Sequence, residues 1–527
     1  MTDDTSKFSR RTVLKGIGTA GVAATVPTGS AAAFPGLDSD ALSPAIQDDF
    51  GYFGSLVPTA SVVTYGSMRR PQFVVTIDEG EKANLQSWEA DDKNRTIHDE
   101  LSETEFLVSA PAEHVVQTGF GLIGSDNPLS DLAYVTGVDY NLRFDAQPVE
   151  TLASESEFAA PTGASIVEAL SGGRFDAAGL AFSDNATKGS LSKSVEYLKN
   201  GESADGTGIT VAVLDSGCNT ASDSSVFGSR IVAAKNLVTD ETGVDAVSDP
   251  NGHGTWCCAA AVGSSGVAPG ASLLVGKVMG DDGSGTTADI VAGVRWAVEQ
   301  GADVLSMSLG APVYSQKLAE VVSDAVESGV CVVIATGNSR QTVRWVASPA
   351  DADAEGIVRV SATDLPESAI GDAKSAYFAQ VGPDAGAADG SMGETRGAAP
   401  TVAAPGMLVE ATVPDTDGST FAHTLSGTRM ATPQVAGVIA AAMGADSSLV
   451  GDPASVVKRM ENQSVPAPAC GTTEVGAGIP DISLLASNTD ADSSQEDERD
   501  DEAKARDAAN RTLSGSFLDS YFTPKDI

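Results

Sequence analysis

The sequence predicts an α/β fold with a mostly parallel central sheet in a three-layer arrangement, preceded by a small α+β region. Two observations carry this prediction. Short, apolar, β-branched segments alternate with segments of helical spacing after residue 208, and polar motifs directly follow these apolar segments. Strands of a parallel sheet are buried on both faces and are therefore apolar throughout. Alternation of such strands with helices gives a sheet that is covered by helices on both faces.

The first region, residues 34–155, has a different pattern. It contains strand-like segments at 72–77 and 105–108 and a helix-compatible piece at 126–132. This mixture is typical of a small α+β domain. The Ser-, Ala- and Gly-rich residues 156–206 are expected to form a linker to the next domain.

The second region, residues 207–487, carries the α/β pattern. Its expected strands are 209–214, 303–308 and 330–335, and its expected helices are 289–299 and 318–327. Binding and catalytic sites of such sheets gather at the carboxyl ends of the strands. Asp215 and Asn338 follow two of the expected strands, so we expect the functional site there.

The charge of the chain excludes some functions. The net charge is −40 over 527 residues, and an excess of this size repels nucleic acid and anionic membranes. Because the acidic residues are spread along most of the chain, we interpret them as an adaptation to high salt, where ions screen their repulsion. Residues 488–527, rich in Asp, Glu and Ser at their start, predict a disordered acidic tail.

The first 33 residues predict export. Residues 9–15 contain the pair Arg10 and Arg11, a modestly apolar stretch follows, and residues 31–33 are three alanines. This pattern is typical of a twin-arginine signal peptide with a small-residue cleavage site. Since no later apolar run reaches the ~18 residues that span a bilayer, we expect a secreted protein without stable membrane insertion. The five cysteines do not define a disulfide framework.

Four motifs stand in a fixed order along the second region. They are VLDSG at 213–217, NGHGT at 251–255, IATGN at 334–338 and SGTRMATP at 426–433. Together they resemble the subtilisin-like serine proteases, the subtilases. With the leader and the acidity, the chain is most similar to the halolysins that haloarchaea secrete. The resemblance extends over about residues 208–486 and implies the three-layer subtilisin-like fold.

The resemblance assigns roles to three residues. A serine hydroxyl is a poor nucleophile until an imidazole takes its proton, and a carboxylate fixes the tautomer of that imidazole. Subtilisin has these groups in the chain order acid, base, nucleophile. The resemblance therefore implies that Asp215 is the orienting carboxylate and His253 the base. Asn338 matches the amide donor of the oxyanion hole, where negative charge develops in the transition state.

Two further segments resemble those that bind substrate in the family. They are Gly283, Ser284 and Gly285, and Ser308, Leu309 and Gly310. Such segments pair with a peptide as additional β-strands. A peptide or an unfolded protein is therefore the expected ligand, and the chemistry requires no cofactor and no metal. Structural calcium stays open, because Asp281 and Asp282 are suggestive but match no defined calcium loop.

Residues 34–155 resemble the prodomain of these proteases in position, size and α+β character. In the family, such a domain assists folding and occupies the cleft until it is cut away. The resemblance thus implies that the chain's own prodomain is a partner of its cleft.

The nucleophile position departs from the family pattern, as does Trp256, where many members have a second His. The family has Ser in Gly-Thr-Ser-Met-Ala, and this chain has Arg429 there. A guanidinium stays protonated, offers no lone pair and cannot act as a nucleophile. Two alternatives stay open. In the first, Cys257, which lies one helical turn past His253, replaces the serine as nucleophile. In the second, His253, Cys257 and Cys258 form a metal site, although no fourth ligand is evident. Ser426 is a weaker substitute, since family members commonly carry a serine there.

Two functions follow from these residues. The first is a pseudoprotease that keeps the subtilase fold to bind peptides, a partner or its own prodomain. The alternative is a secreted serine endopeptidase of the Asp-His-Ser type in which Arg429 is a recent lesion, a sequence error or a deliberate inactivation. In either case the chain cannot cut itself as written, so we expect the prodomain to stay attached unless another protease removes it.

Overall fold

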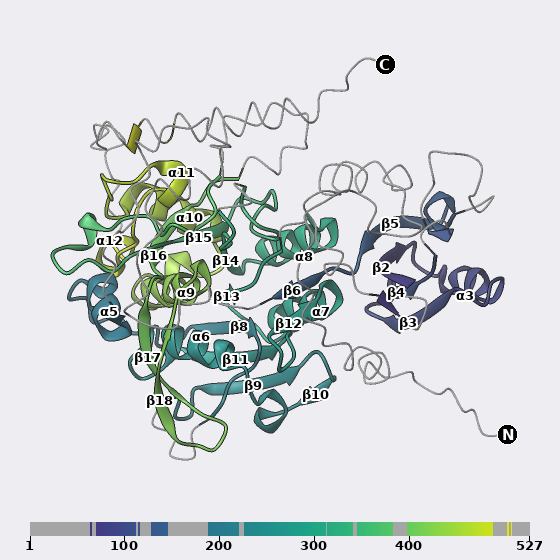
Figure 1. The fold of residues 1–527 in the computed structure, drawn as a ribbon, viewed down its shortest axis with the longest axis horizontal. Helices are drawn as coiled ribbons and strands as arrows, with labels where there is room; N and C mark the ends of the chain where they lie inside the picture. Colours follow the sequence, from purple (N-terminus) through teal and green to yellow (C-terminus); the bar gives the residue numbers. More distant parts are fainter. Residues whose placement is uncertain are drawn as a thin grey trace, which may run out of the picture.

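The structure is a computed structural model that describes residues 64–65, 70–111, 114–115, 128–145, 188–220, 226–311, 314–340, 345–382, 398–487, 503–504 and 507. The predicted leader lies outside these residues, as do most of the predicted linker and most of the acidic tail. The described residues form a smaller N-terminal body, built around β2 to β5, and a larger body that contains all later elements (Figure 1).

An eight-stranded sheet forms the centre of the larger body. Its strands lie in the order β10 (Glu241–Thr242), β9 (Ile231–Asn236), β11 (Ser272–Lys277), β8 (Thr210–Asp215), β13 (Val304–Met307), β14 (Cys331–Ala335), β15 (Ile357–Thr363) and β16 (Val402–Pro405). Neighbouring strands from β9 to β16 are parallel, and β10 is antiparallel to β9. The three strands predicted in this region are β8, β13 and β14, and the predicted mostly parallel sheet is confirmed.

Helices cover both faces of this sheet, which gives three layers. One face packs against α6 (His253–Val262) and α9 (Thr428–Ala445), and the other against α7 (Thr287–Glu299) and α8 (Gln316–Glu327). The helices α7 and α8 are those predicted at 289–299 and 318–327. Each begins where a hydroxyl accepts a backbone N–H in the first turn: Thr286 from Asp289 and Ser315 from Leu318. The buried helix α9 continues from the fourth sequence motif.

Shorter elements complete the larger body. They are α5 (Leu191–Lys199), α10 (Pro453–Gln463), α11 (Thr472–Val475), α12 (Ile482–Leu485) and the 3-10 turns η5 (Val244–Val247), η6 (Ile370–Asp372) and η9 (Ser447–Leu449). The hairpin of β17 (Val409–Pro414) and β18 (Thr420–Leu425) pairs with β7 (Gly189–Ser190). One residue of the predicted acidic tail, Asp507, is buried here and accepts hydrogen bonds from Thr472 and Thr473.

The N-terminal body is an antiparallel sheet with one α-helix. Its elements are β1 (Thr64–Tyr65), β2 (Arg70–Ile77), α3 (Lys82–Ala90), β3 (Thr96–Glu100), β4 (Glu105–Ser109) and β5 (Val135–Tyr140). The strands predicted at 72–77 and 105–108 are β2 and β4. Of the helix-compatible piece at 126–132, the structure describes residues 128–132, which form a 3-10 turn, η4 (Leu129–Asp131), between the extended backbones of Pro128 and Leu132.

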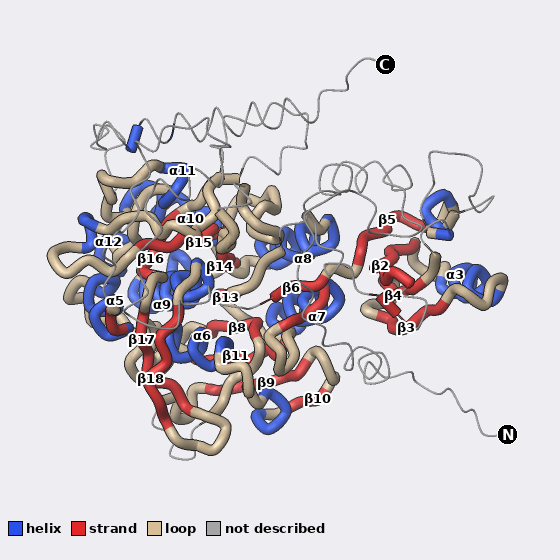
Figure 2. The backbone as a smooth tube through the Cα atoms, viewed as in Figure 1, coloured by secondary structure: helices blue, strands red, loops and turns tan. Residues whose placement is uncertain are grey.

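A short strand joins the two bodies. Strand β6 (Arg143–Asp145) leaves the N-terminal body and pairs antiparallel with β12 (Ser284–Thr286) of the larger body. Figure 2 shows β6 between the two bodies, beside β12 and α7. Within the described part of the chain, no helix has the length and hydropathy that crossing a membrane requires. All five cysteines are buried and carry free thiols.

Candidate functional site

A buried carboxylate orients a buried imidazole at the carboxyl end of the sheet. Asp215 is the last residue of β8 and His253 the first residue of α6. The Nδ1 atom of His253 lies 2.8 Å from Oδ1 of Asp215, and each side chain is only 1% exposed. The Nε2 atom of His253 has no hydrogen-bond partner among the described residues. The ring is therefore fixed through one nitrogen and keeps the other available.

Asp249 fixes the backbone around this pair, a role that was not predicted from the sequence. Its Oδ1 accepts from the Ser216 hydroxyl at 2.8 Å and from the Gly252 N–H at 3.0 Å. Its Oδ2 accepts from the N–H and the hydroxyl of Thr255 at 2.8 and 2.6 Å. Asp249 thus ties the loop after β8 to the first turn of α6. An acidic residue just before a Gly-flanked helix start is a capping signal that could have indicated it.

Asn338 lies at the amino end of α9. Its Oδ1 accepts from the N–H and the hydroxyl of Thr428, at 2.8 and 2.9 Å. Its Nδ2 is buried and has no partner in the described part of the chain. Gly427 makes the close approach possible, because a Cβ there would lie 2.9 Å from that Nδ2. The end of β14 and the start of α9 are thus brought together, as the motif order predicts.

Arg429 is the second residue of α9 and is 8% exposed. Its carbonyl accepts from the Ser308 hydroxyl at 2.8 Å and lies 3.8 Å from Sγ of Cys257, which is itself 3.8 Å from Nδ1 of His253. Its guanidinium donates to the Gly310 carbonyl at 3.4 Å. Among the described residues, Arg429 forms no ion pair with Asp215, whose Oδ2 has no hydrogen-bond partner there.

Cys257 completes a group of three possible metal ligands. Ligand atoms of Asp215, His253 and Cys257 all lie within 4.8 Å of one another, and the group does not include Cys258. Burial, followed by the charge of Asp215, raises the pKa of Cys257 well above its usual range. A buried neutral thiol is a poor nucleophile. Nδ1 of His253 already bonds to Asp215, so the three residues are best described as an oriented imidazole above a thiol.

The two acidic residues that suggested calcium are bonded to protein donors. Oδ1 of Asp281 accepts from the Lys277 ammonium at 3.0 Å. Oδ1 of Asp282 accepts from the N–H and hydroxyl of Ser284, and its Oδ2 accepts from Arg143 at 3.1 Å. Calcium binding by this chain stays a prediction.

The predicted segment 283–285 pairs with the chain's own N-terminal part. Gly285 is opposite Phe144 in the β12–β6 register, and Phe144 is fully buried. A side chain at Gly285 would not fit, because its Cβ would lie 2.4 Å from the Val278 carbonyl. The place for an additional strand is therefore taken by residues 143–145.

The N-terminal body also binds the amino ends of two helices. At α8, Oδ2 of Asp139 accepts from the Ser315 hydroxyl at 2.8 Å and from the Lys317 N–H at 3.0 Å. At α7, Oδ1 of Asn141 accepts from the Ala288 N–H at 3.2 Å. Carboxylate and amide oxygens at these positions satisfy N–H groups that a helix leaves free, and the carboxylate also complements the helix dipole.

Glu105 forms the charged centre of the same contact. Its Oε1 accepts from Arg295 of α7 at 2.7 Å and from Lys317 of α8 at 2.9 Å. Burial alone would raise the pKa of Glu105, but the hydrogen bonds and charges of Arg295 and Lys317 outweigh it and lower that pKa. Glu105 therefore stays ionised between the two cations.

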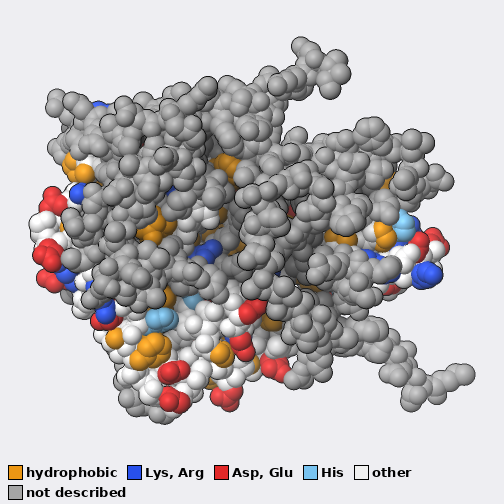
Figure 3. Space-filling model, viewed as in Figure 1, with side chains coloured by type: hydrophobic (Ala, Val, Ile, Leu, Met, Phe, Trp, Pro, Cys, Tyr) orange, Lys and Arg blue, Asp and Glu red, His pale blue; other side chains and the backbone are white. Residues whose placement is uncertain are grey.

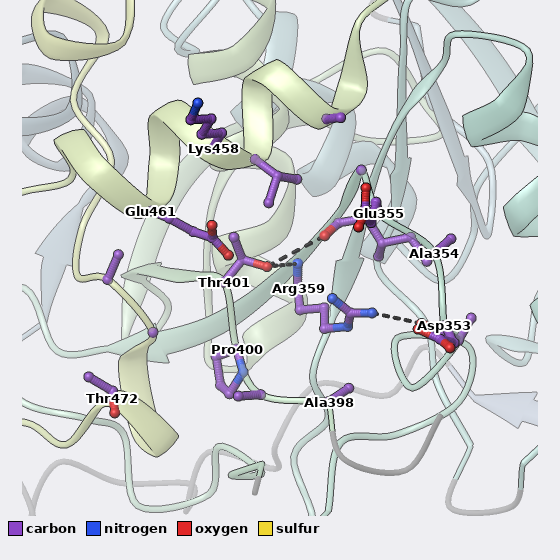
Figure 4. Close-up of a pocket in the computed structure, with 18 of the residues that line it drawn as sticks. Asp353, Ala354, Glu355, Arg359, Ala398, Pro400, Thr401, Lys458, Glu461 and Thr472 are labelled. Carbon is purple, nitrogen blue, oxygen red and sulfur yellow. Dashed lines mark hydrogen bonds between the residues drawn. The ribbon is translucent and has the colours of Figure 1, made fainter. Parts of the chain in front are cut away.

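A cavity in the larger body lies apart from these residues. It has a volume of about 1010 Å³ and is lined by residues of β15, α10, α11 and the segment before β16 (Figure 4). Arg359 lines it and donates to the carbonyls of Ala350 and Ala352, both at 2.7 Å. None of the site residues described above lines this cavity, so its size does not make it the candidate site.

Comparison with known proteins defines the class of protein. The family model of the subtilase family matches residues 206–500, more than half of the chain, and the chain therefore belongs to the subtilase family. Subtilisin BL of Lederbergia lenta is 36% identical over 242 residues, which are 45% of this chain and 76% of that protein.

Other relatives match over less of their length. The major intracellular serine protease of Bacillus subtilis (strain 168) is 45% identical over 141 residues, 25% of this chain and 44% of that protein. The crystal structure of fervidolysin from Fervidobacterium pennivorans, a keratinolytic enzyme related to subtilisin, superposes with a TM-score of 0.58 at 20% identity. That match covers 83% of this chain and 64% of fervidolysin, and it supports the subtilisin-like fold.

Proposed function

We propose that this subtilase binds peptides without hydrolysing them and that its own N-terminal body is the first occupant of its cleft. Arg429 carries the proposal. It stands at the start of α9, where the resemblance of the fourth motif places the serine nucleophile. Its backbone carbonyl lies next to Cys257 and Ser308, and Cys257 in turn lies next to His253. No acyl-enzyme can form on a guanidinium.

The rest of the catalytic machinery is assigned by the same resemblance. Asp215 would orient His253, His253 would be the base, and the Nδ2 of Asn338 would stabilise an oxyanion. The 2.8 Å contact between His253 and Asp215 and the unpartnered Nδ2 support these roles. Each role requires a serine to produce hydrolysis.

The cleft is assigned to residues 283–285 and 308–310. The pairing of Gly285 with Phe144 supports a cleft that binds an extended chain through backbone hydrogen bonds. The contacts of Asp139, Asn141 and Glu105 with α7 and α8 support a prodomain that is built to hold this position.

A serine endopeptidase similar to the halolysins is the second candidate. The retained Asp215–His253 pair favours it, because a protein that only binds peptides has no use for an oriented base. On this reading Arg429 is a recent lesion, a sequence error or a deliberate inactivation.

Peptide hydrolysis in molar salt tests the proposal. The natural chain is compared with Arg429→Ser and, as a matched control, Arg429→Gln. We expect the natural chain and Arg429→Gln to be inactive. Loss of the nucleophile costs on the order of 10⁶ in turnover in subtilisin. Hydrolysis by the natural chain would refute the proposal. Activity only in Arg429→Ser would show that the endopeptidase machinery is intact, and inactivity of all three would count against the second candidate.

We also propose export through the twin-arginine pathway of a halophile, with the N-terminal body retained. Residues 1–33 carry the leader pattern, and residues 34–155 would remain because the chain cannot cut itself. Mass spectrometry of the secreted chain provides the test. A start near residue 34 is expected. A start between about residues 150 and 206 would mean that the N-terminal body has been removed.

A further inference from the structure

We propose that the cleft recognises the free C-terminal carboxylate of an extended peptide, through the guanidinium of Arg429 and the amide of Asn338 at the start of α9. This inference rests on the proposed function, since it requires a cleft that binds peptides and does not cut them. It gives the class of ligand for which Arg429, in place of a serine, would make the site selective.

Arg429 brings a positive charge to the start of α9. The side chain of Arg429 is 8% exposed and extends from the first turn of an 18-residue helix to the carbonyl of Gly310. The amino end of a helix also favours a negative charge. A planar guanidinium presents parallel N–H donors that match the two oxygens of a carboxylate.

The amide of Asn338 has a donor without an acceptor among the described residues. Two hydrogen bonds from Thr428 hold Oδ1 of Asn338, and this fixes the direction of the amide. The Nδ2 of Asn338 is buried and has no partner among the residues that the structure describes. A buried donor without an acceptor is costly, so a ligand oxygen at this point would bind favourably. Arg429 directly follows Thr428 in the chain, so both groups belong to the start of α9, and the inference has them act on one carboxylate.

The direction of the bound chain is inferred from the pairing of β6 with β12. Strand β6 runs from Arg143, opposite Thr286, to Asp145, opposite Ser284. The carbonyl of Ser284 accepts a hydrogen bond from the N–H of Gly280. The residue before Gly280, Met279, donates its N–H to the carbonyl of Asp215. Strand β6 therefore lies one strand away from the segment 278–279, which donates to the carbonyl of Asp215, and we take a peptide in the place of β6 to continue from there toward His253. A peptide bound in this direction would present its carboxylate to the start of α9.

Peptide pairs that differ only at the C-terminus test the inference. Acetylated peptides contain residues 139–144 followed by two, three or four alanines, each as the free acid and as the amide. A third peptide of each length is an amide that ends in Asp. Binding to the full chain is measured by fluorescence anisotropy in molar salt. The chains are the natural one, Arg429→Gln, and Lys374→Gln as a control that removes an exposed cation.

For at least one length, we expect the acid to bind about tenfold or more tightly than the amide. Arg429→Gln should abolish that difference, and Lys374→Gln should keep it. Equal binding of acid and amide would overturn this inference and leave the proposed function standing. If the amide ending in Asp binds as tightly as the acid, the site reads acidic side chains and the C-terminal assignment is wrong.

The N-terminal body competes for the same strand position, so a second chain keeps the test decisive. Glu105→Gln weakens its contact with α7 and α8 while leaving the cleft residues unchanged. Tighter binding of the acid to this chain, with the same dependence on Arg429 in the double variant, supports the inference. If no peptide binds even here, the proposed function itself fails, and this inference fails with it.

Discussion

At the residue scale, His253 depends on two buried carboxylates with different tasks. Asp215 bonds to the ring, and Asp249 bonds to the backbone and hydroxyl groups that hold the ring in place. Only the first has a counterpart among the catalytic roles proposed above. The second is a structural anion whose four hydrogen bonds offset the cost of its burial.

Replacement of Asp249 should therefore destabilise the larger body. Asp249→Ala leaves the N–H groups of Gly252 and Thr255 without their acceptor. We expect the free energy of unfolding to fall by roughly 3 kcal/mol or more. Thermal unfolding in molar salt measures this, with Asp245→Ala, at an exposed position nearby, as the control. Equal melting temperatures of the two variants would contradict the role given to Asp249.

His98 makes the N-terminal body sensitive to acid. Its ring nitrogen lies 2.7 Å from the hydroxyl of Ser109, and burial lowers its pKa from 6.5 to about 4. Between these values the unfolded state binds the additional proton. The stability of this body should therefore decrease as the pH falls from about 6.5 to 4, by at most roughly 3 kcal/mol. Hydrogen exchange of β3 and β4 against pH measures this, and His98→Gln should remove most of the slope.

The motifs single out Asp215, His253, Asn338 and Arg429. The structure pairs His253 with Asp215 and places Asn338 against Thr428, the residue before Arg429. The motif order could not indicate Asp249, because an Asp before a helix is common and its four partners come from three separate positions. The direction of the Arg429 guanidinium was also not predictable. It depends on the carbonyl of Gly310, a residue 119 positions earlier in the chain.

At the element scale, the amino ends of α7 and α8 connect the two bodies. Each helix has its own hydroxyl cap, and each also receives an oxygen from the N-terminal body. Glu105 lies between the cations of the same two helices. The N-terminal body therefore interacts at one place with the helix dipoles, with free N–H groups and with two cations of α7 and α8.

Removal of the Glu105 charge should loosen this contact. In Glu105→Gln, the ammonium of Lys317 and the guanidinium of Arg295 lose their shared anion in a buried setting. We expect faster hydrogen exchange in β5 and β6 and faster proteolysis between residues 146 and 187. Glu100→Gln is the matched control, because Glu100 is exposed and pairs only with Lys82 inside the N-terminal body. Identical exchange in both variants would show that the charge is unimportant for docking.

Periodicity found the elements whose burial is uniform, such as β8 and β14, and the amphipathic helix α8. It did not find β6, because a three-residue strand exists only through its partner β12, 139 or more positions away. Strand β9 was also missed, since its outer residues are partly exposed at one side of the sheet. Local pattern cannot indicate an element that long-range pairing creates.

At the scale of the whole molecule, charge is the main feature. In the view of Figure 3, acidic side chains lie on the described surface of both bodies, and basic side chains are interspersed among them in smaller number. With a net charge of −40, self-repulsion should destabilise the compact state when salt is low. Dissolved ions screen charges over about 10 Å at 0.1 M salt and about 3 Å at 1 M.

The melting temperature should therefore rise steadily from about 0.1 M to above 1 M NaCl. Thermal unfolding at several salt concentrations measures this, with sucrose as a control that alters hydration without screening charge. A melting temperature that does not depend on salt would contradict the halophile assignment, and an equal rise in sucrose would mean that screening is not the cause.

Under the proposed function, the pairing of β6 with β12 gives the cleft a competitor that is tethered to it. Residues 143–145 belong to the same chain as the strand they cover, so their local concentration is that of an intramolecular ligand, on the order of millimolar for short flexible links. A free peptide binds only during the fraction of time when β6 has detached, and its apparent affinity is reduced by that fraction. The sensitivity of the cleft to outside ligands is thus set less by the cleft itself than by the stability of a three-residue strand.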